Sequence, residues 1–390
     1  MAQIFLVPGF FGFTKLGAYS YFHRVDEALK TNLKQHGIDA EVVEVDTLPT
    51  ASIRRRAARL IDFVSEHGGL EQDNLHFIGH STGGLDIRMM LSPGIQLRSS
   101  KQEQEIARRT RTVITLSTPH YGTPMANFFT GISGRKLLLV LCLMATSGPG
   151  RYAIYSLARL MQQVAHLDSW LGQRNDILDS VAKNLLSQVR PEEGEEIWQY
   201  LRCISEDQGA MLQLTPEAMD LFNSAVVDQS GIDYVSFVSG SPAPSSRLLI
   251  PGARNLYQSL THLIYAFCYQ LTKSEHRHYP YPRLPAEEQH QSEAHLGFSL
   301  SPSTNDGIVP TLSQFWGRTG GVYSADHMDV VGQFQHAHLG EHYSTWMMSG
   351  SGFNEDRFER MWDDISKAIA KRQRKRKTQT RASKRSTETV

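Results

Sequence analysis

Cysteine is scarce in this chain of 390 residues, which has only Cys142, Cys203 and Cys268. Three distant cysteines can form at most one bridge, so the sequence excludes a small scaffold held together by several disulfides. The first expected strand begins at Gln3, and neither a basic leader nor a cleavage site precedes it. We therefore expect a cytoplasmic protein, with contact to a membrane surface as the further option.

Long apolar runs are also missing. The run at residues 137–145 is nine residues long, whereas a membrane-spanning helix needs about 20. An apolar content of 40% suits one large domain with insertions, and we place that domain at residues 1–370.

The formal net charge is zero, but the charge is unevenly distributed along the chain. Residues 371–390 hold nine Lys or Arg against one Glu, which predicts a basic disordered tail. Such a tail could contact anionic lipid headgroups. No aromatic residue interleaves with these charges, so we expect no specific nucleic-acid binding.

Short buried-strand patterns alternate with helical ones along the chain. This alternation predicts the α/β class, with a mostly parallel central sheet covered by helices on both faces. The expected strands are Gln3–Val7, Ala40–Val45, Leu75–Gly79, Val113–Ser117 and Tyr234–Ser239, with a further one at Gly321–Ser324. The expected helices run from Phe22 to Gly37, from Ser52 to Gly68, from Thr82 to Leu91 and from Asp356 to Arg372.

More than a hundred residues separate the strands at 113–117 and 234–239, which is far beyond a usual connection. We predict an inserted helical cap at about 123–230 and a second insertion at about 241–300. The cap is either a mobile lid or a pair of ordinary core helices. The second insertion holds an apolar helix at 256–271, and the polar stretch at 273–291 is expected to be a solvated loop.

The sequence Gly79-His80-Ser81-Thr82-Gly83 follows an expected strand and precedes an expected helix. A serine nucleophile needs an exposed, tight strand-to-helix turn, and small residues two before and two after the serine let this turn close. The same pattern also arises by chance. It gains weight only if an acid and a histidine follow in that order.

Both residues do follow. Asp306 lies in an Asn-Asp-Gly turn, and His327 comes just after the expected strand at 321–324. Asp306 could also be an ordinary turn aspartate, and the chain has 16 histidines. Order and spacing favour His327 as the base and Asp306 as the residue that orients it.

A glycine-rich bend follows the first expected strand at residues 8–12. Such a bend can direct main-chain N–H groups at a developing oxyanion. We predict the N–H groups of Phe10 and Thr82 as the two donors. The alternative is an ordinary turn after an edge strand.

Together, these segments resemble bacterial true lipases of the α/β-hydrolase superfamily. The resemblance covers most of residues 2–370 and implies the α/β-hydrolase fold, with Ser81 as nucleophile and His327, Asp306, Phe10 and Thr82 in the roles given above. The segments that carry it are 7–13 (VPGFFGF), 79–83 (GHSTG), 117–124 (STPHYGTP), 305–309 (NDGIV) and 327–333 (HMDVVGQ).

The chain also departs from this family. Pro8 stands where these lipases usually carry histidine, which removes a side-chain donor near the oxyanion loop. Some relatives bind a structural calcium, and Asp329 and Gln333 fall where two ligands would lie. Because residues 241–305 contain no aspartate, one expected carboxylate is missing, and we predict no cofactor, with structural calcium as the alternative.

A second metal candidate is the group His336, His338, Glu341 and His342. No further residues with zinc-ligand spacing accompany it, so we expect pocket or surface histidines and no metal.

The predicted function is a serine carboxylic ester hydrolase that acts on medium-chain or long-chain acyl esters through an acyl-enzyme. The partner is therefore a lipid or another ester, with peripheral membrane contact through the cap and the basic tail. The alternatives are a soluble short-chain esterase and a non-catalytic lipid-binding protein of the same fold. The oligomeric state does not follow from the sequence.

Overall fold

A six-stranded sheet forms the centre of the molecule, in the order β4-β1-β5-β6-β7-β8, and all neighbouring strands are parallel. The computed structural model describes residues 1–10, 12, 15–16, 19–98, 100–130, 207, 209–245, 256–274, 281–334 and 347–387. The strands of the sheet are Ala2–Val7 (β1), Ala40–Glu44 (β4), Leu75–His80 (β5), Thr110–Leu116 (β6), Asp233–Gly240 (β7) and Arg318–Ser324 (β8). Two short strands, Lys15–Leu16 (β2) and Tyr19–Ser20 (β3), form a separate antiparallel pair.

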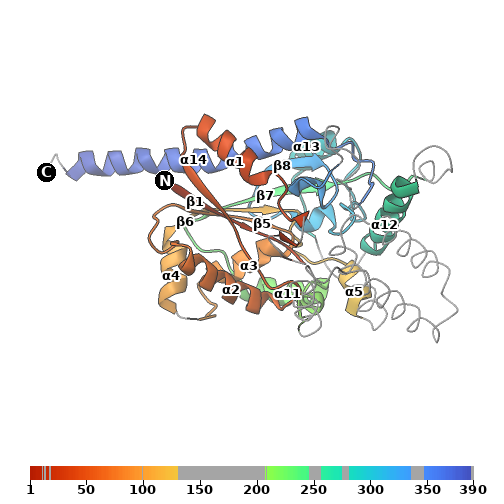
Figure 1. Cartoon of the computed structure of the whole chain (residues 1–390), viewed down its shortest axis with the longest axis horizontal. Helices are drawn as coiled ribbons and strands as arrows, with labels where there is room; N and C mark the ends of the chain where they lie inside the picture. The colour runs from red at the N-terminus through yellow and green to blue at the C-terminus, as the bar shows by residue number, and fades with distance from the viewer. Residues whose placement is uncertain are drawn as a thin grey trace.

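Strand β1 shows how both faces of the sheet are covered. Successive side chains of a strand point to opposite faces. Ile4 and Leu6 enter one core with the helices Val25–Gln35 (α1) and Glu355–Thr387 (α14), whereas Phe5 and Val7 enter a second core. The second core is closed by the helices Ile53–Glu66 (α2), Thr82–Leu91 (α3) and Ser100–Arg109 (α4). The predicted parallel sheet with helices on both faces is confirmed (Figure 1).

Most of the remaining elements belong to the two long connections, from β6 to β7 and from β7 to β8. Between β6 and β7 lie the helices Met125–Thr130 (α5), Gly209–Gln213 (α10) and Pro216–Ala225 (α11). Between β7 and β8 lie Leu256–Thr272 (α12), Ala286–Leu296 (α13) and the short 3-10 helix Thr311–Gln314 (η2), and after β8 comes Asp329–Val331 (η3). Residues 131–206 of the predicted cap and the histidine group at 336–342 lie outside the described residues.

The prediction of a solvated loop over residues 273–291 was wrong in its last part, because α13 begins at Ala286. The segment has almost no apolar face, so no helical period was visible in the sequence. Pro285 precedes the helix, Glu287 and Glu288 lie in its first turn, and Gly297 ends it in a left-handed conformation. These are favourable helix-end residues.

Helix α14 crosses the whole sheet and then extends beyond it. Its start at Glu355 forms an ion pair with Arg24, which precedes α1 at the carboxyl edge of the sheet, where the parallel strands end. Further along, Arg372 donates to the carbonyl of Gly231, just before β7 begins. The helix therefore runs to the amino edge, where the strands begin, and projects past it (Figure 1).

The basic segment from residue 371 is helical as far as Thr387, where the sequence led us to expect a disordered tail. Lys, Arg, Gln and Ala are good helix formers, and a helix that has already formed on the protein can be extended without a new nucleation step. Among the described residues, no helix has the length and apolar character needed to cross a membrane.

Candidate active site at the carboxyl edge of the sheet

Ser81 lies in the tight turn between β5 and α3. Its backbone angles are φ 53° and ψ −128°, a strained conformation for a residue with a side chain. A Cβ on Gly79 would lie 2.5 Å from a main-chain nitrogen of α3, and one on Gly83 would lie 2.2 Å from the carbonyl oxygen of Val7. The turn can therefore close only with glycine at both places, which is the spacing that the sequence shows.

Asp306 and His327 meet on neighbouring loops that follow β7 and β8. Asp306 Oδ2 lies 2.8 Å from His327 Nδ1, and both side chains are buried. Asp306 Oδ1 accepts the main-chain N–H groups of Ile308 and Val309, at 2.9 and 2.7 Å. Because an ionised carboxylate only accepts, His327 Nδ1 carries the proton, and the lone pair of the neutral ring is on Nε2.

Two further side chains hold the Asp306 carboxylate, and the sequence had not pointed to either. Ser239 Oγ and Gln314 Nε2 donate to Asp306 Oδ2 at 2.9 and 3.1 Å, and the Gln314 carbonyl in turn accepts the Ser239 N–H at 2.7 Å. Ser239 lies at the end of β7 and Gln314 in η2. Only the tertiary structure brings these positions together.

The loop after β1 packs directly on the nucleophile turn. A Cβ on Gly9 would lie 2.5 Å from Ser81 Cβ, so only glycine permits this approach. The guanidinium of Arg56 is completely buried beneath the loop and donates to the carbonyls of Pro8 and Gly9, at 2.8 and 3.1 Å. Arg56 therefore supplies hydrogen-bond donors to the loop after β1, where the side chain of Pro8 has none.

Arg56 also forms a fully buried ion pair with Asp86 of α3, with a shortest N–O distance of 2.8 Å. Burial raises the pKa of Asp86 to about 6, although the nearby Arg56 acts in the opposite direction. The direct ion pair favours the ionised carboxylate, so the loop after β1 is tied to the helix that begins at Ser81.

The two predicted oxyanion donors border the same turn. Thr82 is the first residue of α3, and the main-chain N–H groups at a helix start attract negative charge. Phe10 directly follows Gly9, and its half-buried ring packs against the core. Both N–H groups therefore belong to segments in contact with Ser81.

His80 links this turn to the loop of His327. His80 Nε2 lies 2.9 Å from the carbonyl oxygen of His327, and the two ring centroids are 4.6 Å apart. On its other side, His80 Nδ1 lies 2.6 Å from the hydroxyl of Tyr21. The structure thus gathers Ser81, His327 and Asp306, with Phe10 and Thr82, at one edge of the sheet.

The loop after His327 contains the two residues predicted as calcium ligands if that ion binds. Asp329 Oδ2 accepts from the Asp326 N–H and from Ser351 Oγ, both at 2.8 Å, and the Gln333 amide donates to the carbonyl of Ser20 at 2.7 Å. Burial raises the pKa of Asp326. Among the described residues, no group of three or more His, Cys, Asp or Glu side chains could hold a metal.

Apolar side chains gather beside the candidate site on α5 and α12. Phe128 of α5 meets Phe267 of α12 edge to face, with ring centroids 5.7 Å apart. Both rings are only partly buried and pack against the same core as Phe10, Ile308 and Met328. The carboxyl edge therefore has an apolar border.

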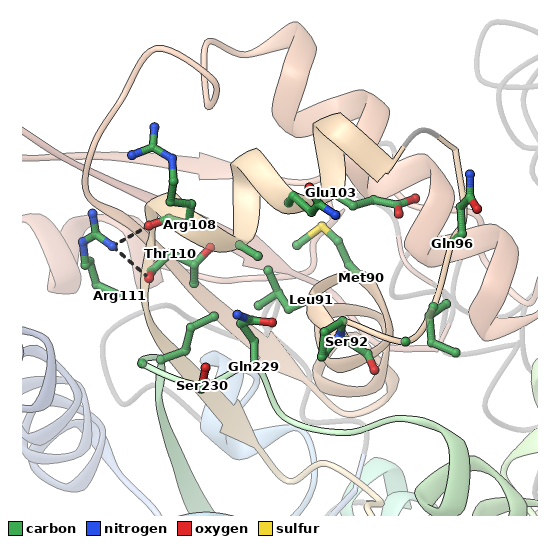
Figure 2. Close-up of a pocket in the computed structure, with 17 residues that line it drawn as sticks. Met90, Leu91, Ser92, Gln96, Glu103, Arg108, Thr110, Arg111, Gln229 and Ser230 are labelled. Carbon is green, nitrogen blue, oxygen red and sulfur yellow. Dashed lines mark hydrogen bonds between the residues drawn. The ribbon is translucent and has the colours of Figure 1, made fainter.

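A pocket of about 580 Å³ lies elsewhere, at the amino edge between the end of α3, helix α4 and the segment before β7. Figure 2 shows Met90 and Leu91 together with polar side chains such as Gln229 and Ser230 around it. None of the predicted site residues lines it.

Comparisons with known proteins agree with this architecture. Residues 29–141 match the family described as "Putative serine esterase (DUF676)", and this segment includes Ser81. The structure is similar to Staphylococcus hyicus lipase, with a TM-score of 0.51 and 16% identity, covering 96% of each chain. It is also similar to lipase 1 from Pelosinus fermentans, with a TM-score of 0.50 and 17% identity, covering 94% of this chain and 98% of that one.

The chain has the α/β-hydrolase fold. In this fold the nucleophile turn follows a central strand, and the acid and the histidine follow later strands of the same sheet. In this chain Ser81 follows β5, Asp306 follows β7 and His327 follows β8. The family match over the Ser81 turn supports an ester hydrolase. No curated protein matches this chain.

Proposed function

We propose that the protein is a serine hydrolase of carboxylic esters, of lipase type, that acts on medium-chain or long-chain acyl groups. The observation that carries the proposal is the 2.8 Å contact between Asp306 and His327 at the edge where Ser81 occupies its strained turn. A buried carboxylate with this contact keeps the proton on His327 Nδ1, so that Nε2 can act as a base.

In the proposed reaction, Ser81 Oγ attacks the ester carbonyl carbon while His327 Nε2 takes the hydroxyl proton. The N–H groups of Phe10 and Thr82 donate to the oxyanion of the tetrahedral intermediate. Collapse of the intermediate expels the alcohol, which receives the proton from His327. Water then attacks the acyl-enzyme while His327 takes its proton, and collapse of the second tetrahedral intermediate returns that proton to Ser81 Oγ and releases the carboxylic acid.

The preference for longer acyl chains rests on the apolar border formed by α5 and α12. Half-buried aromatic rings such as Phe128 and Phe267 can cover an acyl chain as it leaves water. Each buried methylene contributes roughly 0.8 kcal/mol. A short-chain esterase would gain little from such a border.

Hydrolysis of p-nitrophenyl esters with acyl chains of increasing length tests the proposal. We expect the highest kcat/KM on medium or long chains, and we expect Ser81→Ala and His327→Ala to abolish activity while the proteins stay folded. Activity only on short chains would favour the short-chain esterase. No activity, together with no labelling of Ser81 by a fluorophosphonate, would favour a non-catalytic lipid-binding protein.

A further inference from the structure

Three hydrogen bonds in series connect the loop after β1 to the loop after β8. They pass through His80, the residue before Ser81. The Gly9 N–H lies 2.9 Å from the Tyr21 hydroxyl oxygen, which lies 2.6 Å from His80 Nδ1. His80 Nε2 lies 2.9 Å from the carbonyl oxygen of His327. All of these groups are buried, and His80 directly precedes Ser81.

The direction of each bond follows from the chemistry of the partners. The His327 carbonyl can only accept, so His80 carries its proton on Nε2. The Nδ1 lone pair of the neutral ring then accepts from the Tyr21 hydroxyl, and the Tyr21 oxygen is left to accept the Gly9 N–H. Each of the three hydrogen bonds thus has one donor and one acceptor, and the three assignments are mutually consistent.

The surroundings keep both side chains neutral. Burial, and then the nearby His327, hold the pKa of His80 well below its usual range. Burial also raises the pKa of Tyr21. A protonated His80 would carry a donor at Nδ1 in place of the lone pair, so the Tyr21 hydroxyl could no longer donate to it, and the neutral ring preserves the directions given above.

We propose that Tyr21 and His80 are positioning residues that hold the oxyanion loop and the histidine loop in register with Ser81. Tyr21 fixes Gly9, which precedes the donor Phe10, and His80 fixes the main chain of His327. Gly9 packs so closely on Ser81 that a shift of this loop must move the oxyanion donor relative to the reacting oxygen. This inference rests on the proposed function, since positioning matters only if Ser81 reacts.

Tyr21→Phe is the decisive variant, because it removes one oxygen and keeps the ring that packs on Phe22, at 5.0 Å between centroids. We expect kcat to fall roughly 10- to 100-fold with KM within about twofold, since small misplacements at a reacting centre have effects of this size. An alkyl boronic acid, which forms a tetrahedral anionic adduct with a serine, should lose affinity by the same factor. A non-hydrolysable ether analogue of the substrate should bind as before.

Tyr234→Phe is the matched control. Its hydroxyl also accepts a main-chain N–H, that of Gln229 at 3.1 Å, but at the amino edge of the sheet. We expect this variant to lose a similar amount of thermal stability and to keep kcat and the boronic acid affinity. Equal kinetics in Tyr21→Phe and Tyr234→Phe would overturn the inference.

His80→Gln tests whether the three hydrogen bonds act as one unit. Glutamine can still donate to the His327 carbonyl but offers no acceptor at the position of Nδ1. We expect the Tyr21→Phe change to have little further effect on kcat when His80→Gln is already present. Fully independent losses in this double-mutant cycle would contradict a shared role.

These measurements distinguish a failure of the positioning role of Tyr21 and His80 from a failure of the proposed function. A wild-type enzyme that hydrolyses esters and loses activity in Ser81→Ala, but is insensitive to Tyr21→Phe, retains the proposed function and overturns the positioning role. A wild-type protein that neither hydrolyses esters nor reacts with the fluorophosphonate overturns both.

Discussion

Strand β5 buries one histidine near each of its ends, and their surroundings differ. His80 at the carboxyl end has partners at both ring nitrogens, Tyr21 and His327. His76 at the amino end contacts Gln373 through Nε2, while its Nδ1 has no hydrogen-bond partner among the described residues. Burial lowers the pKa of both rings, that of His76 to about 3.

The comparison shows that burial and a shifted pKa do not by themselves indicate function. Buried ion pairs and structural groups shift pKa values as active sites do. The two ends differ in what the ring connects, because His80 joins two loops that border Ser81 whereas His76 joins a strand to helix α14. The contrast between the two edges of the sheet can be tested by comparing a substitution at the carboxyl edge with a similar substitution at the amino edge.

The largest difference is expected between Asp306→Asn, which changes a residue in the connection after β7, and Asp233→Asn, which changes the first residue of β7. An asparagine amide at 306 would donate to His327 Nδ1 and favour the ring tautomer that cannot act as a base. We expect kcat/KM to fall by about 10⁴-fold. Asp233 pairs with Arg318 at the amino edge, and its variant should keep its activity. A loss below tenfold in Asp306→Asn would contradict the assigned role.

Arg56→Met should destabilise the protein by about 3–5 kcal/mol in chemical unfolding, because it leaves Asp86 buried without its ion-pair partner. The double variant Arg56→Met with Asp86→Leu should recover most of this stability. Activity should stay low in both, since the carbonyls of Pro8 and Gly9 have lost their donor. Recovery of activity with stability would show that Arg56 serves the fold alone.

Gly9→Ala and Gly94→Ala compare two glycines at opposite edges. A Cβ at Gly9 would press on Ser81 and the Tyr21 hydroxyl, at 2.5 and 2.8 Å, whereas one at Gly94 would meet nothing within 4 Å. We expect kcat/KM to fall about 100-fold in Gly9→Ala. In Gly94→Ala we expect unchanged activity and no loss of stability. Similar kinetics in both variants would show that the close packing of Gly9 on Ser81 does not matter for activity.

His76→Met should flatten the dependence of stability on pH. The folded His76 has its pKa lowered to about 3, so below pH 6.5 the unfolded chain binds a proton that the folded chain does not. Each such group lowers the free energy of unfolding by about 1.4 kcal/mol per pH unit as the pH falls. The free energy of unfolding, measured between pH 6 and pH 4, should therefore decline less steeply in the variant than in the wild type.

The exposed His290 provides the control for this measurement. His290→Met should leave the decline as it is in the wild type. If the free energy of unfolding declined with falling pH as steeply in His76→Met as in the wild type, His76 would be taking up its proton in the folded protein.

The smallest effect is expected from removing residues 374–390. Within that range, the part of α14 up to Thr387 projects past the amino edge of the sheet (Figure 1), whereas Ser81 follows the carboxyl end of β5. We expect kcat/KM on dissolved esters to change less than twofold. A larger loss would mean that the two edges are coupled.

The sequence alone determined the α/β class, the strands of the six-stranded sheet and the choice of the five candidate residues. This was possible because those signals are local: an apolar run, a glycine spacing, or the order of Ser81, Asp306 and His327. Strand β5 was predicted over Leu75–Gly79 and extends only one residue further, and α3 has the predicted bounds.

Only the tertiary structure decided what supports the site. Arg56, Tyr21 and Ser239 carry no local signal, because each acts on a residue that is close in space but distant in the chain. Tyr21 and His80 are 59 positions apart, and Gln333 reaches the Ser20 carbonyl from 313 positions away. A hydrogen bond depends on the fold that brings its two groups within about 3 Å, and no pattern in neighbouring residues encodes that distance.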